Sequence, residues 1–368
     1  MKHVSYGKIR SQRRVRKALV VTATVGSAVL LAVGYASAST YTTPTATTST
    51  SRSTAATSNG TASTTPTSSN GASPSTSTHR GAARYRFRTI DDAKDPTFNQ
   101  LLGINDRGRI VGYFGSGADA AHPNKGFRIV PPYRQRDFLD KNFPGSAQTQ
   151  VVGVNNAAVA VGFYVDANGA NIGFVAHGQH YTAVANPATS AAAPFNQLLG
   201  INNRGIAVGF YNDADGASHG YTYDTASATF TPVSLPKAVT ANSVTATGIA
   251  DDGDVSGFYT VGKVTIGFAL VRGEFQTLSF GANTNTQALG INNHDRVVGS
   301  YVDAAGTTHG FVWSKGSLVT VDDPNAADAT VVNGLNNRGQ LVGFYTDGAG
   351  NTHGFLATRR TSDDDTES

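Results

Sequence analysis

The sequence predicts an all-β protein, a six-bladed β-propeller of four-stranded antiparallel blades. One pattern, built on Gly-hydrophobic-Asn, a turn, a Val-Gly-aromatic strand and a Gly-aromatic strand, recurs six times from residue 98 to the end. The glycines that begin the copies are Gly103, Gly153, Gly200, Gly248, Gly290 and Gly334. Their intervals of 50, 47, 48, 42 and 44 residues are typical of propeller blades, because a period in the forties with strand-like content fits one blade.

The fifth copy shows the expected strands of one blade. They cover residues 287–292, 296–301, 310–313 and 318–321, which are rich in β-branched and aromatic residues and are separated by Gly, Asn and Asp. Such short runs with tight turns predict an antiparallel meander. The longest link, from Asp322 to Thr330, is expected to lead from the outer edge of one blade to the inner strand of the next.

The ends of the repeat region predict how the propeller closes. The sixth copy stops at Arg359 and Arg360 without a fourth strand, whereas Tyr85–Asp92 precedes the first copy and matches Leu318–Asp323 of the fifth. The N-terminal strand should therefore complete the sixth blade and remove exposed sheet edges. The glycine of each inner strand should permit close approach of neighbouring backbones near the axis.

The first 38 residues predict a signal peptide. Seven Lys and Arg residues precede an apolar stretch, 18–36, and Ala36-Ser37-Ala38 forms a small-x-small cleavage site. The alternative is an uncleaved membrane anchor, because 19 residues nearly span a bilayer. The membrane would be a partner only if the leader is not cleaved. Either reading predicts a secreted or cell-surface protein.

Two further segments flank the expected propeller at 84–360. Residues 39–83 are nearly all Ser, Thr, Ala, Gly and Pro, a composition that predicts a disordered linker. Residues 361–368 contain four acids and predict an acidic disordered tail. The 277 residues between these segments are enough to bury a large core.

Charge and cysteine content exclude some classes of function. The net charge of +4 comes from the leader, because 22 Lys and Arg face 25 Asp and Glu once its seven basic residues are removed. A chain of that charge has no electrostatic basis for binding nucleic acid. The absence of cysteine excludes disulfides and thiolate chemistry.

The repeats resemble the bacterial extracellular repeats named for a His-Ala-Phe signature (HAF repeats). The similarity lies in residues 200–205, 208–211 and 219–221 and in the Thr-Val-Asp-Asp-Pro run at 320–324. The signature histidine is present at His219, His309 and His353, but Lys125, Ile172 and Ile266 replace it elsewhere, and the middle Ala is Gly throughout. The resemblance implies export and a repeat fold, and it implies no reaction.

The strand order should divide the loops between two faces. One face repeats Arg107, Arg204 and Arg338, with His294 at the fifth copy, and is expected to be basic. The other is expected to be acidic, with Asp91, Asp92, Asp95, Asp166, Asp213, Asp215, Asp303, Asp322, Asp323, Asp328 and Asp347. The pairs Asp91-Asp92 and Asp322-Asp323 should lie exposed at the outer rim, where carboxylates stay ionised.

Asp213 and Asp215 are the only candidate metal ligands of this pattern. They offer two hard oxygen donors at alternate positions of one turn, as calcium loops do, but no bidentate acid follows. The stronger interpretation is turn chemistry, because Asp caps such turns and Gly216 supplies positive φ. The three signature histidines come from different copies and should lie apart, with packing roles. No other cofactor is expected.

The sequence therefore favours a non-catalytic binding or interaction scaffold at or outside the cell surface, with an unknown protein or glycan ligand. The alternative is a carbohydrate-binding or carbohydrate-active protein that uses the acidic face. No catalytic constellation supports an enzyme, because no pair of carboxylates is placed across one cleft as glycoside hydrolysis requires. Phosphate loops and nucleophile elbows are also absent from the sequence.

Overall fold

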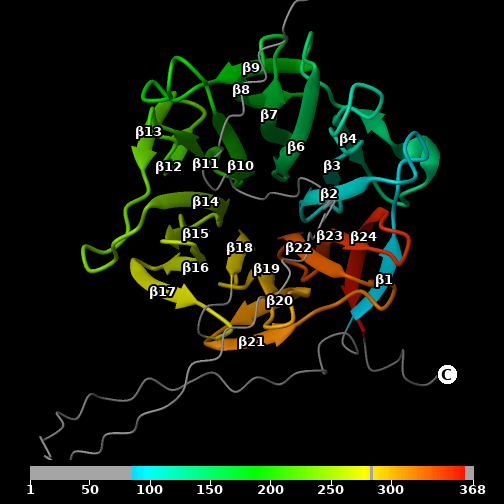
Figure 1. Cartoon of the computed structure of the whole chain (residues 1–368). Coiled ribbons are helices and arrows are strands. Elements are labelled where there is room, and N and C mark those ends of the chain that lie inside the picture. Colours follow the sequence, from blue (N-terminus) through cyan, green and yellow to red (C-terminus); the bar gives the residue numbers. More distant parts are fainter. Residues whose placement is uncertain (1–84, 282–284, 361–368) are drawn as a thin grey trace, which may run out of the picture.

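The computed structural model describes residues 85–281 and 285–360, which form a closed ring of radiating sheets around a central axis (Figure 1). The expected signal peptide, the linker and the acidic tail lie outside the described residues. Within the described part of the chain, no helix has the length and apolar character needed to cross a bilayer.

Each repeat contributes four consecutive strands, called A to D from the axis outward, and the last repeat takes its D strand from the N-terminus. Repeat 1 comprises β2 (Asn99–Ile104), β3 (Ile110–Phe114), β4 (Lys125–Ile129) and β5 (Leu139–Asp140), with a 3-10 turn at Gln135–Asp137. Repeat 2 comprises β6 (Gln148–Val154), β7 (Val159–Val165), β8 (Asn171–His177) and β9 (His180–Val184). Repeat 3 comprises β10 (Asn196–Ile201), β11 (Ile206–Asn212), β12 (Ser218–Asp224) and β13 (Thr229–Pro232).

The second half of the ring repeats this order. Repeat 4 comprises β14 (Ser243–Ile249), β15 (Val255–Val261), β16 (Val264–Val271) and β17 (Glu274–Leu278). Repeat 5 comprises β18 (Thr286–Ile291), β19 (Val297–Val302), β20 (Thr308–Ser314) and β21 (Ser317–Thr320). Repeat 6 comprises β22 (Ala329–Leu335), β23 (Leu341–Thr346), β24 (Thr352–Arg359) and β1 (Tyr85–Thr89).

The prediction of six separate blades is wrong, because the described strands form five sheets. Four repeats stand as separate four-stranded blades, whereas repeats 5 and 6 form one eight-stranded sheet through the parallel pair Thr308 and Ala329. Two other boundaries also carry a parallel bridge, Phe98 with Thr352 and Asn171 with Phe195. Among the described strands, only between repeats 5 and 6 does the bridge fall inside both strands and join the sheets.

The predicted closure by the N-terminal strand is confirmed. Strand β1 pairs antiparallel with β24 from Tyr85 opposite Arg359 to Thr89 opposite Phe355, and the two strands lie side by side in Figure 1. The ring of Phe87 packs edge-on against that of Phe355, with 5.3 Å between centroids. The first and last parts of the ring are therefore held by main-chain pairing and by core contact.

The inner strands crowd at the axis as their glycines predict. A Cβ on Gly103 would lie 2.5 Å from the carbonyl oxygen of Val152 in the next repeat, closer than real Cβ atoms approach. Each A strand also shifts register just before its glycine, as between Leu101 and Gly103. Glycine thus lets the six inner strands meet around one axis.

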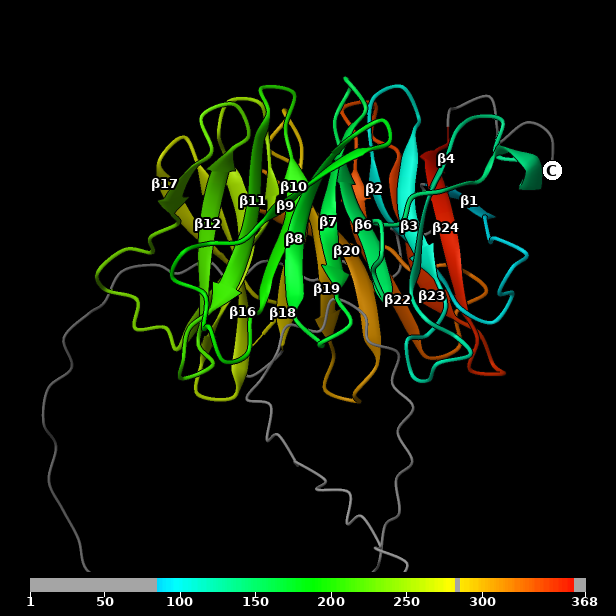
Figure 2. The same cartoon turned by 90° about the horizontal axis from the view of Figure 1, so that it is seen from above.

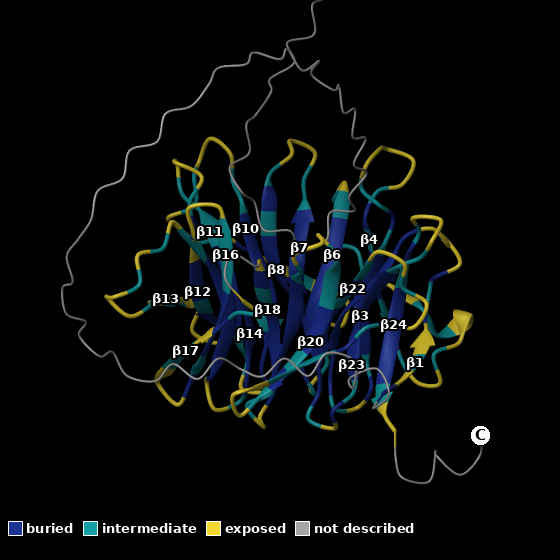
Figure 3. Cartoon of the chain, turned by 60° about the horizontal axis from the view of Figure 1, so that its bottom comes forward, coloured by how far each residue is buried: buried dark blue, intermediate teal, exposed yellow. Residues whose placement is uncertain are grey.

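The core lies between neighbouring sheets, and the C strands supply most of its largest fully buried side chains. The aromatic residue after each Gly of strand C is buried, with at most 1% of its surface exposed: Phe127, Phe174, Tyr221, Phe268, Phe311 and Phe355. Burial of one such ring stabilises the fold by about 1.5–3 kcal/mol. Figure 3 shows buried strands and exposed loops at both faces.

The strands run between two faces of the ring, as the view in Figure 2 shows. We call the face formed by the A–B and C–D turns the AB face, and the opposite one, formed by the B–C turns and D–A links, the BC face. Residues at equivalent positions of the six repeats therefore lie on the same face.

Candidate functional site

The axial mouth of the AB face is closed by two tiers of hydrogen bonds between repeats. In the deeper tier, the side-chain amide of Asn105 donates to the carbonyl oxygen of Asn155 at 2.8 Å, and Asn155 donates to that of Asn202 at 3.1 Å. Asn202, Asn292 and Asn336 continue the tier in the same way. It is broken only at Ala250, the one repeat position without an amide.

The upper tier, called the Asn/Asp ring, is complete. Each main-chain N–H donates to the side-chain oxygen of the next repeat at 2.7–3.0 Å. The members are Asp106, Asn156, Asn203, Asp251, Asn293 and Asn337. Asp106 and Asp251 lie three positions apart, and each accepts further bonds from the amides on both sides.

These bonds keep both ring acids ionised. Burial opposes ionisation of Asp106, but hydrogen bonds from Asn156 and Asn337 outweigh it and hold the pKa below its usual value. Amides of Asn203 and Asn293 have the same effect on the pKa of Asp251. The hollow enclosed by the ring is only about 80 Å³, and its acids are already bonded, so we interpret the ring as a lock between repeats.

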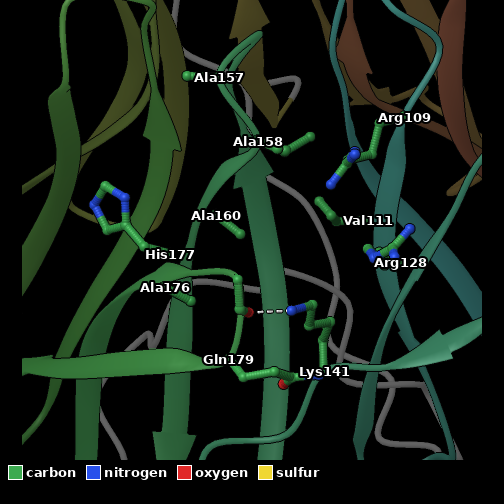
Figure 4. Close-up of a pocket in the computed structure, with 12 residues that line it drawn as sticks. Arg109, Val111, Arg128, Lys141, Ala157, Ala158, Ala160, Ala176, His177 and Gln179 are labelled. Atoms are coloured by element: carbon green, nitrogen blue, oxygen red, sulfur yellow. Dashed lines mark hydrogen bonds between the residues drawn. The ribbon is translucent and has the colours of Figure 1, made fainter.

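A larger pocket lies off the axis on the AB face, between repeats 1 and 2. It has a volume of about 280 Å³ and is called the basic pocket. Its twelve lining residues are Arg109, Val111, Arg128, Lys141, Val154, Ala157, Ala158, Ala160, Ala176, His177, Gly178 and Gln179. None of them is an acid. Figure 4 shows the three cations beside the small side chains of repeat 2.

The two repeats make opposite contributions to the basic pocket. Repeat 1 supplies Arg109 just before β3, Arg128 in β4 and Lys141 just after β5. Repeat 2 supplies four alanines, of which Ala160 and Ala176 lie in β7 and β8. Long cationic side chains of repeat 1 therefore face small alanine side chains of repeat 2, which leave the space of the pocket unfilled.

The cations of the basic pocket repel one another. Burial and the nearby charges of Arg128 and Arg107 lower the pKa of Arg109, and burial with Arg128 and Arg109 lowers that of Lys141. Within residues 85–281 and 285–360, no ion pair joins these three side chains to an acid. The Lys141 ammonium donates to the carbonyl oxygen of Gly178. A bound anion would relieve this repulsion, and two guanidiniums could hold a carboxylate or sulfate.

Asp213 and Asp215 take the turn role. Oδ1 of Asp213 accepts the main-chain N–H groups of Asp215 and Ala217, both at 2.9 Å. Oδ2 of Asp213 lies 2.7 Å from Nε2 of His219. Both oxygens of the Asp213 carboxylate are therefore engaged, and calcium binding at this turn stays a prediction.

The three signature histidines lie apart, each beside acids of its own blade. Nε2 of His309 lies 3.3 Å from Asp303 and its Nδ1 lies 2.9 Å from Asp322. His353 has the same two contacts, with Asp347 and with Asp91 of the N-terminal strand segment. His309 and His353 thus join the B–C turns to the segments that follow the D strands, whereas His219 contacts its B–C turn acid.

Two expectations about the acids are wrong. Asp92 and Asp323 are not exposed at the rim, because only 4% and 3% of their surfaces are accessible, and burial raises the pKa of Asp323. The AB face is basic only in part. Its turns also carry Asp106, Asp251, Asp252, Asp254 and Asp295.

The sequence did not lead us to the basic pocket or the Asn/Asp ring, although the pocket left a signal. The second residue after the A–B turn is Arg109 in repeat 1 but Val159 and Ile206 in the next two repeats. Repeat 2 has Ala157 where three others have arginine. Comparison of the repeats position by position would have singled out this boundary.

The fold and the axial ring define a β-propeller. No protein-family model and no curated protein sequence matches the chain. Among solved structures, a fucose-specific lectin from Aleuria aurantia is similar at 10% identity and a TM-score of 0.45, over 72% of this chain and 95% of that one. A mutant of AofleA from Arthrobotrys oligospora is similar at 8% identity and a TM-score of 0.45, over 75% of this chain and 90% of that one. XC5397 from Xanthomonas campestris, described as a gluconolactonase, is similar at 13% identity and a TM-score of 0.42, over 76% of this chain and 92% of that one. Similarities this distant do not identify a ligand for this chain.

Proposed function

We propose that the chain is an exported, non-catalytic β-propeller that binds an acidic polysaccharide through the basic pocket. The observation that carries this proposal is the gathering of Arg109, Arg128 and Lys141 around a pocket without an acid. Such a site favours carboxylate or sulfate groups, because guanidinium forks match their geometry.

The size of the basic pocket supports one anionic sugar residue rather than a whole polymer. Its volume of about 280 Å³ lies just below the range of about 300–1,000 Å³ that is usual for small-molecule sites. A polymer could place one acidic residue between repeats 1 and 2 while its neighbours extend over the AB face. His177 and Gln179 at the rim of the pocket could hydrogen-bond sugar hydroxyls.

The BC face offers a weaker case for a carbohydrate site. Asp166, Asp303 and Asp347 each accept main-chain N–H groups of their own turns. Asp91, Asp322 and Asp213 lie against histidines. Since these acids already serve turns and strand contacts, the proposed ligand site lies on the opposite face from the one that sequence reasoning favoured.

The test is titration calorimetry of the full chain with polygalacturonate and with dextran sulfate, and with neutral dextran as reference. We expect binding of an acidic polymer and none of dextran. Arg128→Gln should weaken binding about tenfold, the effect of losing one charge-assisted pair. Arg204→Gln removes an arginine from the same face outside the pocket and should bind as the wild type does.

Three results would contradict the proposal. Equal losses in Arg128→Gln and Arg204→Gln would show diffuse charge attraction rather than a pocket. Depolymerisation of either polymer would contradict the non-catalytic part. Retention in the cytoplasm, with residues 1–38 still attached, would contradict export.

A further inference from the structure

Three carboxylates converge on the AB face between repeats 4 and 5, away from the basic pocket. Asp252 and Asp254 belong to the A–B turn of repeat 4, and Asp295 belongs to that of repeat 5. One carboxylate oxygen of each lies within 4.8 Å of the other two. Such hard oxygen donors on two adjoining turns match what Ca²⁺ prefers.

Asp254 points to a ligand independently of this clustering. Only 6% of its surface is accessible. Oδ1 accepts the main-chain N–H of Arg272 at 2.7 Å, whereas Oδ2 is buried and has no hydrogen-bond partner among the described residues. A buried, unpaired carboxylate oxygen is costly unless a proton or a cation compensates it.

Repeat 4 is the exception among the repeats at this position. The residues equivalent to Asp254 are Arg109, Val159, Ile206, Arg296 and Gln340. The repeat that carries the acid therefore lies opposite repeat 1, whose arginine lines the basic pocket. A turn that needed only a polar cap would not require a buried acid here, since other repeats use arginine, valine, isoleucine or glutamine.

Arg272 forms an ion pair with this cluster. Its Nη2 lies 2.8 Å from Oδ2 of Asp295. The side chain of Arg272 is 77% exposed, so it can move into solvent without loss of packing. One guanidinium therefore faces three carboxyl groups and can balance at most one of their charges.

We propose that Asp252, Asp254 and Asp295 bind a divalent, oxygen-preferring cation such as Ca²⁺, which joins the A–B turns of repeats 4 and 5 and displaces Arg272. Water and main-chain carbonyl groups would complete the coordination, as in other calcium sites. The site does not depend on the polysaccharide ligand proposed above.

The experiment is calorimetric titration of Ca²⁺ into the full chain after treatment with EDTA. We expect one bound ion. Asp254→Asn should weaken binding about tenfold or more, because it removes the buried charged ligand. Arg272→Gln should strengthen binding several-fold, because the competing charge is lost. A gain of affinity cannot arise from misfolding, so this variant keeps the test valid if Asp254→Asn is unstable.

Asp224→Asn is the matched control, because it makes the same change at a turn acid of repeat 3 that lies outside the cluster. It should bind Ca²⁺ like the wild type. Terbium gives a second measurement, since Trp313 is the only tryptophan and pairs with Val297, two residues after Asp295. Tryptophan-sensitised emission that Asp254→Asn abolishes and Asp224→Asn retains would support the site.

If Arg272→Gln binds Ca²⁺ and the wild type does not, the site is also supported, because the Arg272 guanidinium would then compete effectively with the ion in the wild type. Unchanged affinity in both Asp254→Asn and Asp295→Asn would overturn the proposal. So would failure of both the wild type and Arg272→Gln to bind at about 10 mM Ca²⁺, beyond the range of weak extracellular calcium sites.

Discussion

Nδ1 of His353 lies 2.7 Å from Oδ2 of Asp91, so the side chain of the last strand is bonded to the segment that enters from the N-terminus. Oδ1 of Asp91 also accepts the main-chain N–H of Gly354 at 2.9 Å. Since 262 residues separate the two partners, the contact exists only when the ring is closed. It links the protonation of one histidine to the closure of the propeller.

This contact predicts that closure weakens as the pH rises. Burial alone would lower the pKa of His353, but Asp91 and Asp347 outweigh it and raise the pKa above 6.5. The stabilisation is complete below pH 6.5 and is lost as the pH rises through the raised, folded-state pKa. The melting temperature should therefore fall by a few degrees between about pH 6 and about pH 9.

The variant His353→Gln should remove part of this pH dependence. His309 makes the same two contacts within repeat 5, and its pKa is also raised by Asp322 and Asp303 against the effect of burial. His309→Gln should therefore also flatten the pH profile, but without exposing the N-terminal strand to proteolysis. A pH profile unaltered in both variants would disprove the linkage.

The closure itself predicts unequal effects of two deletions. Removal of residues 84–92 takes away β1 and Asp91, and leaves β24 as an open edge that favours aggregation. We expect a large drop in melting temperature or loss of soluble protein. Removal of residues 39–80 should leave the melting temperature nearly unchanged. Similar melting curves for the two deletions would show that β1 does not close the ring.

The Asn/Asp ring predicts a second, independent contribution to closure. Asp251→Ala removes the acceptor for the side-chain amides of Asn203 and Asn293. Because these donors lie in a partly buried ring, the free energy of unfolding should fall by about 1–3 kcal/mol. Chemical denaturation measures this. The control is Asp215→Ala, an exposed turn acid, and an equal loss there would rule out a special role for the ring.

The same ring predicts sensitivity to acid. The pKa values of Asp106 and Asp251 lie below the ordinary value of 3.8. The stabilisation that they provide is present above pH 3.8 and is lost as the pH falls through their lower, folded-state pKa values. Asp106→Asn combined with Asp251→Asn should thus flatten the acid limb of the stability profile. An unchanged acid limb would contradict this assignment.

Sequence reasoning succeeded where one segment carries its own evidence. The match of Tyr85–Asp92 to Leu318–Asp323 predicted strand β1 and its partner, because the pattern of a D strand is local. It failed where features depend on neighbouring repeats. The amide of Asn337 meets Asp106 only after the ring closes, and no local pattern reports that distance.

Three other failures have similar causes. The basic pocket depends on the sizes of Ala160 and Ala176 relative to the cations of another repeat, which is a property of the boundary rather than of either strand. The joining of repeats 5 and 6 depends on a single pair, Thr308 with Ala329. Asp92 and Asp323 were placed at an exposed rim because the cover provided by the D–A links is a tertiary feature.

The last prediction concerns the charge balance of the basic pocket, which can be changed without removing any cation. Ala158 lines the pocket and already carries a Cβ at a positive φ of 64°, so Glu and Gln at this position meet the same backbone cost and differ mainly in charge. In Ala158→Glu, the new carboxylate should pair with Arg109 or Arg128 and weaken binding of polygalacturonate about tenfold or more. Ala158→Gln has nearly the same shape without the charge and should lose much less affinity. Asn168→Glu adds the same charge to the BC face of the same repeat and should leave binding unchanged. Calorimetric titration of the three variants separates the alternatives. Equal losses in Ala158→Glu and Ala158→Gln would indicate steric blocking, whereas an equal loss in Asn168→Glu would indicate overall charge rather than a site.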